Sequence, residues 1–326
     1  MLNLWRLRML HDLSLLGTIS AVAGSLKLTR PAVSQQLKLL EREAGAVLFE
    51  RGGRTVQLTA TGRRLVTRAS TLFELVEDIE AELGIVKNNA VSGEISIAAF
   101  GSLLTGLLPA AYSDLVSHYP KLDIIFNEMK PADGLRAAAA RQVDLALVDD
   151  QVSEEAFVGS LEFHPLCVDH YGAAVAAGHP LAGRRSIRLA ELAHERWAMG
   201  REGVAHYRFL INACHAAGFA PRIVSRSANM SARLELVRTG HVVTVLPWLA
   251  LRLVEHDPDF RLLSLQPPLS RKIFVALPRG SSRRPAVAAV CRALQRAARE
   301  TEYLNHARSA LPEKRQPLRK RTVPGL

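Results

Sequence analysis

Two short amphipathic segments joined by a tight turn, at residues 18–37, constrain this chain more than any other feature. Thr18 and Thr29 each precede a run with helical apolar spacing, where a side-chain oxygen can cap a helix. Pro31 falls in the first turn of the second segment, where its missing N–H costs nothing. Apolar residues recur at spacings of three and four in both segments, so each helix has one buried face. The pattern predicts a helix-turn-helix.

The opposite side of the second helix carries long or hydroxyl-bearing polar side chains. Such groups reach base edges and phosphates when a helix lies in the major groove of DNA. We therefore predict that this side reads DNA, although a solvated face of a small helical domain would show the same pattern. The predicted DNA-binding residues of this motif are Thr18, Thr29, Arg30, Pro31, Ser34, Gln35 and Lys38.

A basic hairpin is expected directly after these helices. Residues 48–59 are typical of a strand, a Gly-Gly turn and a second strand, with Arg51 and Arg54 beside the turn. We expect Arg51, Arg54 and Thr18 to hold phosphates. Base reading is assigned to Arg30, Ser34 and Gln35.

A further pattern runs through this stretch in a fixed order and spacing: Ala32-Val33-Ser34, Leu40-Glu41, Gly45, Leu48-Phe49-Glu50-Arg51, Leu58-Thr59 and Thr61-Gly62. With these positions the stretch resembles the LysR-type transcriptional regulators. Two positions depart from the family pattern: Val22 stands where the family prefers Ala, and Gly24 replaces a longer polar residue. The resemblance implies an α/β fold with an N-terminal winged helix-turn-helix, a linker helix and two α/β subdomains similar to type 2 periplasmic solute-binding proteins.

The net charge of +11 lies at the two ends of the chain. Residues 1–68 carry a net +7 and residues 308–326 a net +5, while the section between them is close to neutral. A basic N-terminal module on a neutral body indicates DNA binding by that module. We expect the basic tail, residues 310–326, to be disordered. No apolar run approaches the ~20 residues of a membrane span, so we expect a cytoplasmic protein without membrane contact.

A heptad-like pattern follows the hairpin. Its apolar spacings of four and three are typical of a coiled-coil seam. A helix of roughly 40 Å, at about 1.5 Å per residue, is too long for the small N-terminal domain to cover. We therefore expect a second copy of the chain to pack against it. A helix packed on its own domain is the alternative. A homodimer or homotetramer with paired recognition helices implies a partly palindromic promoter site in double-stranded DNA. The seam comprises Leu65, Ala69, Leu72, Val76, Ile79, Leu83 and Val86.

Strand and helix patterns alternate through the rest of the chain, which favours parallel sheets covered by helices. We expect one helix from Leu103 past Pro109 to His118, and separate strands at 166–168 and 171–176 after a break at His164-Pro165. With the family resemblance, the expected domains are a winged helix-turn-helix at 1–60, a linker helix at 61–88 and an effector-binding domain at 92–304. Its subdomain I holds 93–163 plus 269–304, and its subdomain II holds 164–268.

Ligands of open α/β sheets bind beyond the carboxyl ends of strands. Gly101-Ser102 ends a strand and opens a helix, so free N–H groups and the Ser102 and Thr105 hydroxyls predict an anion site, and the family resemblance implies an effector carboxylate there. Arg201 is expected to complete the charge pairing. Helix capping and a solvated arginine would explain the same residues without a ligand. The predicted effector-binding residues are Ser102, Leu103, Thr105, Glu128, Lys130, Arg201, Asn229 and Met230.

The predicted function is a sequence-specific transcriptional regulator whose promoter binding responds to a small anionic co-inducer. We expect no catalytic residue, no metal site and no other cofactor; RNA polymerase is a further candidate partner. An enzyme fused to a helix-turn-helix, as in biotin-ligase repressors, and a solute-binding transport component are the alternatives. The sequence contains none of the catalytic motifs sought for the first, and we expect no export signal for the second. Cys167, Cys214 and Cys291 are expected to be buried structural residues, with a Cys167–Cys214 redox pair as the alternative.

Overall fold

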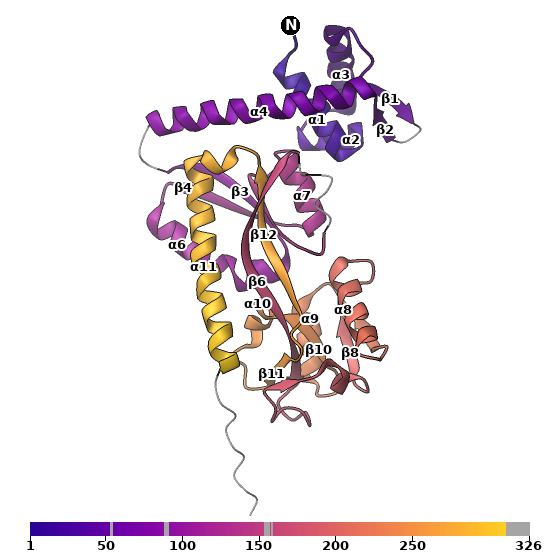
Figure 1. The fold of residues 1–326 in the computed structure, drawn as a ribbon, viewed down its shortest axis with the longest axis vertical. Coiled ribbons are helices and arrows are strands. Elements are labelled where there is room, and N and C mark those ends of the chain that lie inside the picture. The colour runs from indigo at the N-terminus through magenta and orange to yellow at the C-terminus, as the bar shows by residue number, and fades with distance from the viewer. Residues whose placement is uncertain (53–54, 88–90, 153–156, 158, 311–326) are drawn as a thin grey trace, which may run out of the picture.

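Three helices and a two-stranded hairpin form the N-terminal part of the chain (Figure 1). The structure, a computed structural model, describes residues 1–310 except 53–54, 88–90, 153–156 and 158. The predicted residue Arg54 and the tail segment 311–326 lie outside the described residues. The N-terminal elements are α1 (Leu4–Leu16), α2 (Ile19–Ser25), α3 (Arg30–Ala44), β1 (Phe49–Gly52) and β2 (Thr55–Leu58), and the two strands pair antiparallel.

Both predicted N-caps are confirmed. Thr18 Oγ1 accepts a hydrogen bond from the backbone N–H of Ala21 at 3.2 Å, which begins α2. Thr29 Oγ1 accepts one from the N–H of Ala32 at 3.4 Å, which begins α3. The apolar faces of these helices pack together with those of α1 and of the next helix, α4 (Ala60–Lys87), in one core. The chain therefore folds here as its local pattern predicts.

The long helix α4 (Ala60–Lys87) presents apolar residues on two faces. Ala69 and Phe73 are buried in the core of the N-terminal part, and Leu65 packs against that core. Leu72 and Ile79 are exposed. The seam predicted to start at Leu65 is therefore divided, because α1 covers one face of the first turns. The side chains of the last two predicted seam residues, Leu83 and Val86, are not among those that the structure describes.

The rest of the described chain is built around an eight-stranded mixed sheet in the order β4-β3-β5-β12-β6-β11-β7, with β10 also paired to β6. Strand β3 runs parallel to β4 and β5, whereas β12 runs antiparallel to β5 and β6. We call the part around β3, β4 and β5 the first half, and the part around β7 to β11 the second half. The strands are β3 (Gly93–Ala99), β4 (Leu122–Glu128), β5 (Leu145–Asp149), β6 (Leu161–Ala176), β7 (Ser186–Ile187), β10 (Thr244–Pro247), β11 (Phe260–Leu265) and β12 (Ser270–Pro278), and a separate parallel pair is formed by β8 (Arg196–Met199) and β9 (Arg222–Arg226).

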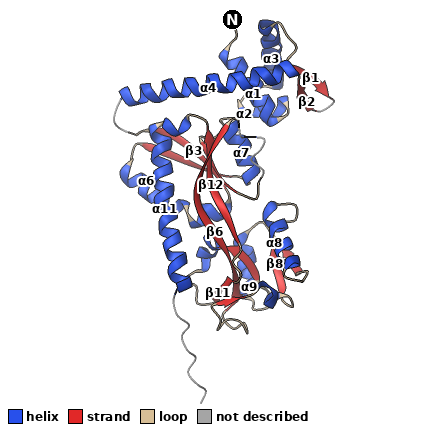
Figure 2. Ribbon diagram, viewed as in Figure 1, coloured by secondary structure: helices blue, strands red, loops and turns tan. Residues whose placement is uncertain are grey.

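Strands β6 and β12 are long and continue from the first half into the second (Figure 2). The two strands predicted at 166–168 and 171–176 are therefore wrong, because one strand covers both. Proline removes a ladder hydrogen bond, which is why Pro165 indicates a boundary in the sequence. The strand accommodates it at an irregularity instead: Ile273 pairs with Cys167 but Phe274 with Pro165, so the register skips one residue of β6.

Helices cover the sheet on both sides, and α11 packs against α6 and β6. The single helix predicted at 103–118 is wrong, because α5 ends at Gly106 and α6 begins at Leu108. Pro109 cannot donate to the carbonyl of Thr105, which ends the first helix. None of the described helices is long and apolar enough to cross a membrane. The helices are α5 (Gly101–Gly106), α6 (Leu108–His118), α7 (Pro131–Ala139), α8 (Ala205–Ala216), α9 (Met230–Arg238), α10 (Trp248–Leu251) and α11 (Pro285–Ala310), with short 3₁₀ turns η2 (Leu189–Leu192), η3 (Arg252–Val254) and η4 (Ser281–Arg283).

Candidate functional site

Helix α3 buries apolar side chains on one side and exposes polar side chains on the other. Val33 and Leu37 are fully buried, whereas Arg30, Gln35 and Lys38 are exposed. The structure thus presents the predicted base-reading side of α3 to solvent. Of the other predicted residues, Pro31 and Thr29 are exposed, and Ser34 and Thr18 are half-buried. The β1 backbone at Arg51 is described but its side chain is not.

The hairpin is tied to α3 by a single carboxylate. Glu41 Oε1 accepts hydrogen bonds from the backbone N–H groups of Leu48 at 2.9 Å and Phe49 at 3.4 Å. The other end of the module is held by Arg6, which donates to Gln36 Oε1 at 2.9 Å and pairs with Glu43. These contacts use the side of α3 that faces its own domain. Its exposed side stays open to an outside partner.

A cavity of about 790 Å³ lies between the two halves of the sheet domain. The first half contributes the start of α5 and the ends of β4 and β5; the second half contributes the starts of α8 and α9. This is the edge that the strand-end rule selects. Five of the predicted effector residues line this cavity: Ser102, Glu128, Lys130, Arg201 and Met230.

The other three predicted effector residues lie elsewhere. Leu103 is fully buried in the core of the first half. Thr105 is exposed, and its hydroxyl donates to the carbonyl of Gly101 at 3.1 Å, which satisfies it within its own helix. Asn229 Oδ1 accepts from the N–H of Ala232 at 3.2 Å and caps α9. Core packing and helix capping therefore explain these residues, and we correct their assignment to the ligand.

Sequence reasoning missed the arginine at the centre of the buried polar network. Arg271 of β12 donates to Asp169 Oδ2 at 2.7 Å from Nη2 and to Asp149 Oδ2 at 3.3 Å from Nη1. Its guanidinium carbon lies 4.8 Å from the centre of the Phe100 ring. Nη2 also donates to Ser102 Oγ at 2.6 Å. The hydroxyl predicted to hold an anion is thus already paired, with a group 169 residues away in sequence.

Two opposite effects act on the pKa values of the carboxylates in this network. Burial raises the pKa of Asp149 and of Asp169, and the neighbouring Arg271 guanidinium opposes that rise. Asp169 also accepts a hydrogen bond from the N–H of Leu249 at 3.2 Å through Oδ1. The network therefore joins β5, β6, β12 and the start of α10 at one buried point.

A second polar group is centred on Tyr171. Its hydroxyl accepts a hydrogen bond from Gln151 Nε2 at 3.0 Å and lies 3.2 Å from His206 Nδ1, whose ring stacks on the phenol. Burial and the charges of Arg271 and Arg233 lower the pKa of His206 to about 3, so its imidazole is neutral at physiological pH. His206 Nε2 and Gln151 Oε1 are buried and have no hydrogen-bond partner among the described residues.

Arg233 of α9 lines the same cavity and is only 4% exposed. Its Nε and Nη1 are buried without a hydrogen-bond partner in the part of the chain that the structure describes. Burial lowers the pKa of this guanidinium to about 10, so it still carries its charge at neutral pH. The sequence held one signal of this: Arg233 shares the buried face of α9 with Leu234 and Val237.

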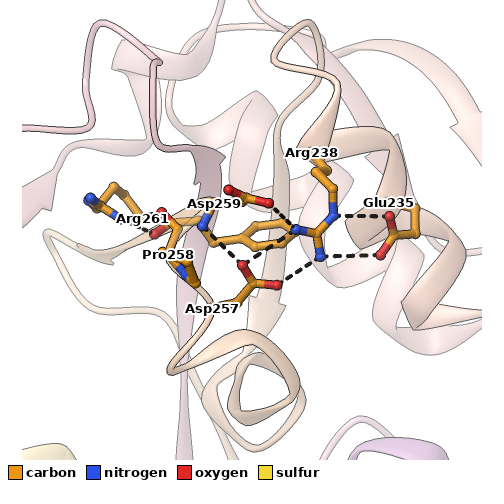
Figure 3. A network of polar contacts seen from close by, with 7 residues as sticks. Glu235, Arg238, Asp257, Pro258, Asp259 and Arg261 are labelled. Carbon is orange, nitrogen blue, oxygen red and sulfur yellow. Dashed lines mark hydrogen bonds and ion pairs between the residues drawn. The ribbon is translucent and has the colours of Figure 1, made fainter.

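The far end of α9 is fixed by a cluster of carboxylates around Arg238 (Figure 3). Its guanidinium pairs with Asp257 at 2.8 Å, with Asp259 at 2.5 Å and with Glu235 at 3.1 Å, and it lies over the ring of Phe260. The Arg238 hydrogen bonds lower the pKa of Asp257. Contacts at both ends of α9, the Asn229 cap and this cluster, therefore set the position of Arg233 between them.

All three cysteines are unbridged thiols. Cys214 is fully buried, and burial raises its pKa to about 12; burial likewise raises the pKa of Cys291 to about 11. A thiol reacts as its thiolate, so these two are poor nucleophiles. Cys214 and Cys167 are buried in core clusters as predicted, whereas Cys291 is only half-buried against the core of the first half.

Comparisons with known proteins match both parts of the chain to the same family. Residues 4–63 match the model "Bacterial regulatory helix-turn-helix protein, lysR family", and residues 88–299 match "LysR substrate binding domain". The transcriptional dual regulator GltC of Bacillus subtilis is 27% identical over 217 residues, which cover 66% of this chain and 71% of GltC.

Solved structures show the same fold. A full-length OxyR variant from Pseudomonas aeruginosa superposes with a TM-score of 0.66 at 20% identity, covering 90% of this chain and 98% of that one. Full-length CbnR in complex with its target DNA gives a TM-score of 0.53 at 19% identity, covering 91% of this chain and 100% of that one. A helix-turn-helix with an open polar face, joined to a two-part domain with a cavity between its parts, accordingly makes this chain a member of the LysR family of DNA-binding transcriptional regulators with an effector-binding domain.

Proposed function

We propose that this regulator binds a partly palindromic operator as a homo-oligomer in the bacterial cytoplasm. When a small anion enters the cavity, the protein leaves the operator or changes its position on it. Base reading is assigned to Arg30, Ser34 and Gln35, and phosphate contacts to Thr18, Arg51 and Arg54. The observation that carries the proposal is the division of α3, which buries Val33 and Leu37 and leaves Arg30, Gln35 and Lys38 open.

Charge supports the DNA part of the proposal. The net +7 of residues 1–68 attracts the phosphate backbone whatever the base sequence. Base edges then have to be distinguished by short-range contacts from the open side of α3. The solved complex of CbnR with its target DNA supports this placement through the shared fold.

The oligomer is supported by α4. Leu72, Leu75 and Ile79 are each at least 40% exposed, although they are large and apolar. Burying them against a second α4 would remove apolar surface from water, which stabilises association by about 25 cal/mol per Å². A dimer built on α4 carries two copies of α3, as a two-half operator requires.

The cavity chemistry supports an anion. Its lining has more cationic than acidic residues, and it is formed by both halves, so a bound molecule contacts both. A ligand that binds one relative setting of the halves better than another shifts the population toward it. The cationic lining residues are Lys130, Arg201, Arg208, Arg233 and Arg271, against the acidic residues Glu128, Asp149 and Glu202.

A route from the cavity domain to the DNA-binding module is present within one chain. Arg8 of α1 donates from Nη2 to the carbonyl of Ala140, directly after α7, at 2.6 Å. Arg8 also pairs with Asp12 at 3.1 Å. A shift of α7 would therefore displace α1 through this hydrogen bond. RNA polymerase is the proposed partner where the bound protein activates transcription.

The test compares two adjacent glutamines in full-length protein, on an operator selected in vitro from random duplexes. Gln35→Ala should relax preference at one or two base pairs, with a loss of about 1–3 kcal/mol of discrimination. Gln36→Ala is the matched control, because Gln36 accepts from Arg6 inside the domain; it should leave base preference unchanged. Equal losses on operator and random DNA for Gln35→Ala would contradict the assignment.

A further inference from the structure

We propose that Arg233 is the anchor for the carboxylate of a small hydroxycarboxylate, and that His206 and Gln151 hold the hydroxyl of that ligand. The inference rests on the proposed function, because it specifies the anion that the same cavity receives. Its basis is a set of buried polar atoms, all on residues that line the cavity and all without a partner among the described residues.

Arg233 supplies the charge. Its residue is 4% exposed, it forms no ion pair among the described residues, and two of its guanidinium nitrogens are buried without an acceptor there. A buried charge without a partner is costly, and native structures rarely keep one. A carboxylate bound beside Arg233 would supply both the opposite charge and the missing acceptors.

The other cation at the centre of the cavity is not available for this task. Arg271 already pairs with Asp149 and Asp169 and donates to the Ser102 hydroxyl. Arg201, Arg208 and Lys130 are exposed, where water competes for an anion. Arg233 is therefore the cation whose pairing with an anion would be strongest.

His206 and Gln151 define the second end of the ligand. The hydroxyl of Tyr171 accepts from Gln151, so its own proton is available to Nδ1 of the neutral His206 imidazole, 3.2 Å away, and we assign this direction to the contact. A neutral imidazole carries one proton, so it resides on Nε2, which is a donor without an acceptor in the described part of the chain. Gln151 Oε1 is likewise an acceptor without a donor there. A hydroxyl group both donates and accepts, so one hydroxyl satisfies both atoms.

The experiment uses thermal shift and equilibrium dialysis on the full chain, with pairs of three- to six-carbon 2- and 3-hydroxycarboxylates and the same acids without the hydroxyl. Wild-type protein should bind at least one hydroxy acid about tenfold or more tightly than its deoxy partner. Arg233→Met should abolish that binding, whereas Arg226→Met, on an exposed residue outside the cavity lining, should leave it intact.

A second readout separates an anchor from a structural arginine. Without added acid, Arg233→Met should melt at a higher temperature than wild type, because it removes an uncompensated buried charge. A lower melting temperature, unchanged acid binding in Arg233→Met, or loss only in Arg201→Met would overturn the proposal. Failure of every acid in the panel to bind wild type would also overturn it.

These failures differ from failure of the proposed function. If Arg233→Met and wild type bind the acids equally and both still bind the selected operator, the anchor is wrong and the anion-responsive regulator stands. If wild type binds no operator, the proposed function fails whatever the acids do.

Discussion

Arg271 Nη2 lies 2.6 Å from Ser102 Oγ, which joins the start of α5 to a strand formed near the end of the chain. The same guanidinium holds Asp149 and Asp169, and all four residues are buried. Strand β12 is thereby tied to β5, β6 and α5 by charge as well as by backbone hydrogen bonds. The network is a structural element of the cavity wall.

Arg271→Met should lower the free energy of unfolding by about 3–5 kcal/mol, because it leaves two buried carboxylates without their partner. Urea unfolding followed by circular dichroism measures this. Arg261→Met is the control, since Arg261 is exposed on β11 and its side chain donates to backbone carbonyls; it should change stability by less than about 0.5 kcal/mol. Similar losses in the two variants would argue against the network.

Gly62→Ala and Gly24→Ala should have opposite effects on stability. A Cβ at Gly62 would lie 2.0 Å from the carbonyl oxygen of Leu48, so the helix and the hairpin would have to separate, at a cost of about 1–3 kcal/mol. A Cβ at Gly24 meets nothing within 4 Å and removes the entropic cost of glycine in α2, a gain of up to about 1 kcal/mol. Thermal melts of both variants give the comparison. A stabilising Gly62→Ala would contradict the close approach of Gly62 to the carbonyl oxygen of Leu48.

His206 should make stability fall as the solution becomes acidic. Its pKa is about 3 in the folded protein against 6.5 in the unfolded chain, so below pH 6.5 the unfolded state binds a proton that the folded state does not. From pH 7.5 to 5.5 this group alone should remove about 1.4 kcal/mol of stability. The contribution is complete above pH 6.5 and is lost progressively toward pH 3.

The measurement is urea unfolding at the two pH values in wild type, His206→Gln and His256→Gln. His206→Gln should show a smaller fall in stability on acidification than wild type. His256 has a side chain 93% exposed, so its variant should follow wild type. An identical pH dependence in all three proteins would place His206 in contact with water.

The parts of this fold that follow from neighbouring residues could be predicted from the sequence. The caps Thr18 and Thr29 act within three residues of themselves, and the apolar spacings of α2 and α3 need no information from elsewhere. Strand continuity through Pro165 could not be predicted, because only the partner strand β12 shows how the missing N–H is accommodated.

The cavity shows the same limit. Ser102 and Lys130 can be found from the sequence because strand ends are visible there. Arg271 cannot, since its partners Asp149 and Asp169 are 122 and 102 residues away and nothing local distinguishes it from a solvated arginine. The assignment of Thr105 to the ligand is wrong because a hydroxyl one helical turn from its acceptor looks the same in sequence as one that faces a ligand.

The continuity of β6 and β12 determines what kind of movement the two halves can make. Proteins that close around a ligand through flexible loops concentrate the change in a few backbone dihedral angles. Here a relative rotation of the halves has to be distributed along two hydrogen-bonded strands, of 16 and 9 residues. The elastic cost then rises with the angle, so we expect an effector to act by a small torsion of the sheet, centred on the irregularity at Pro165.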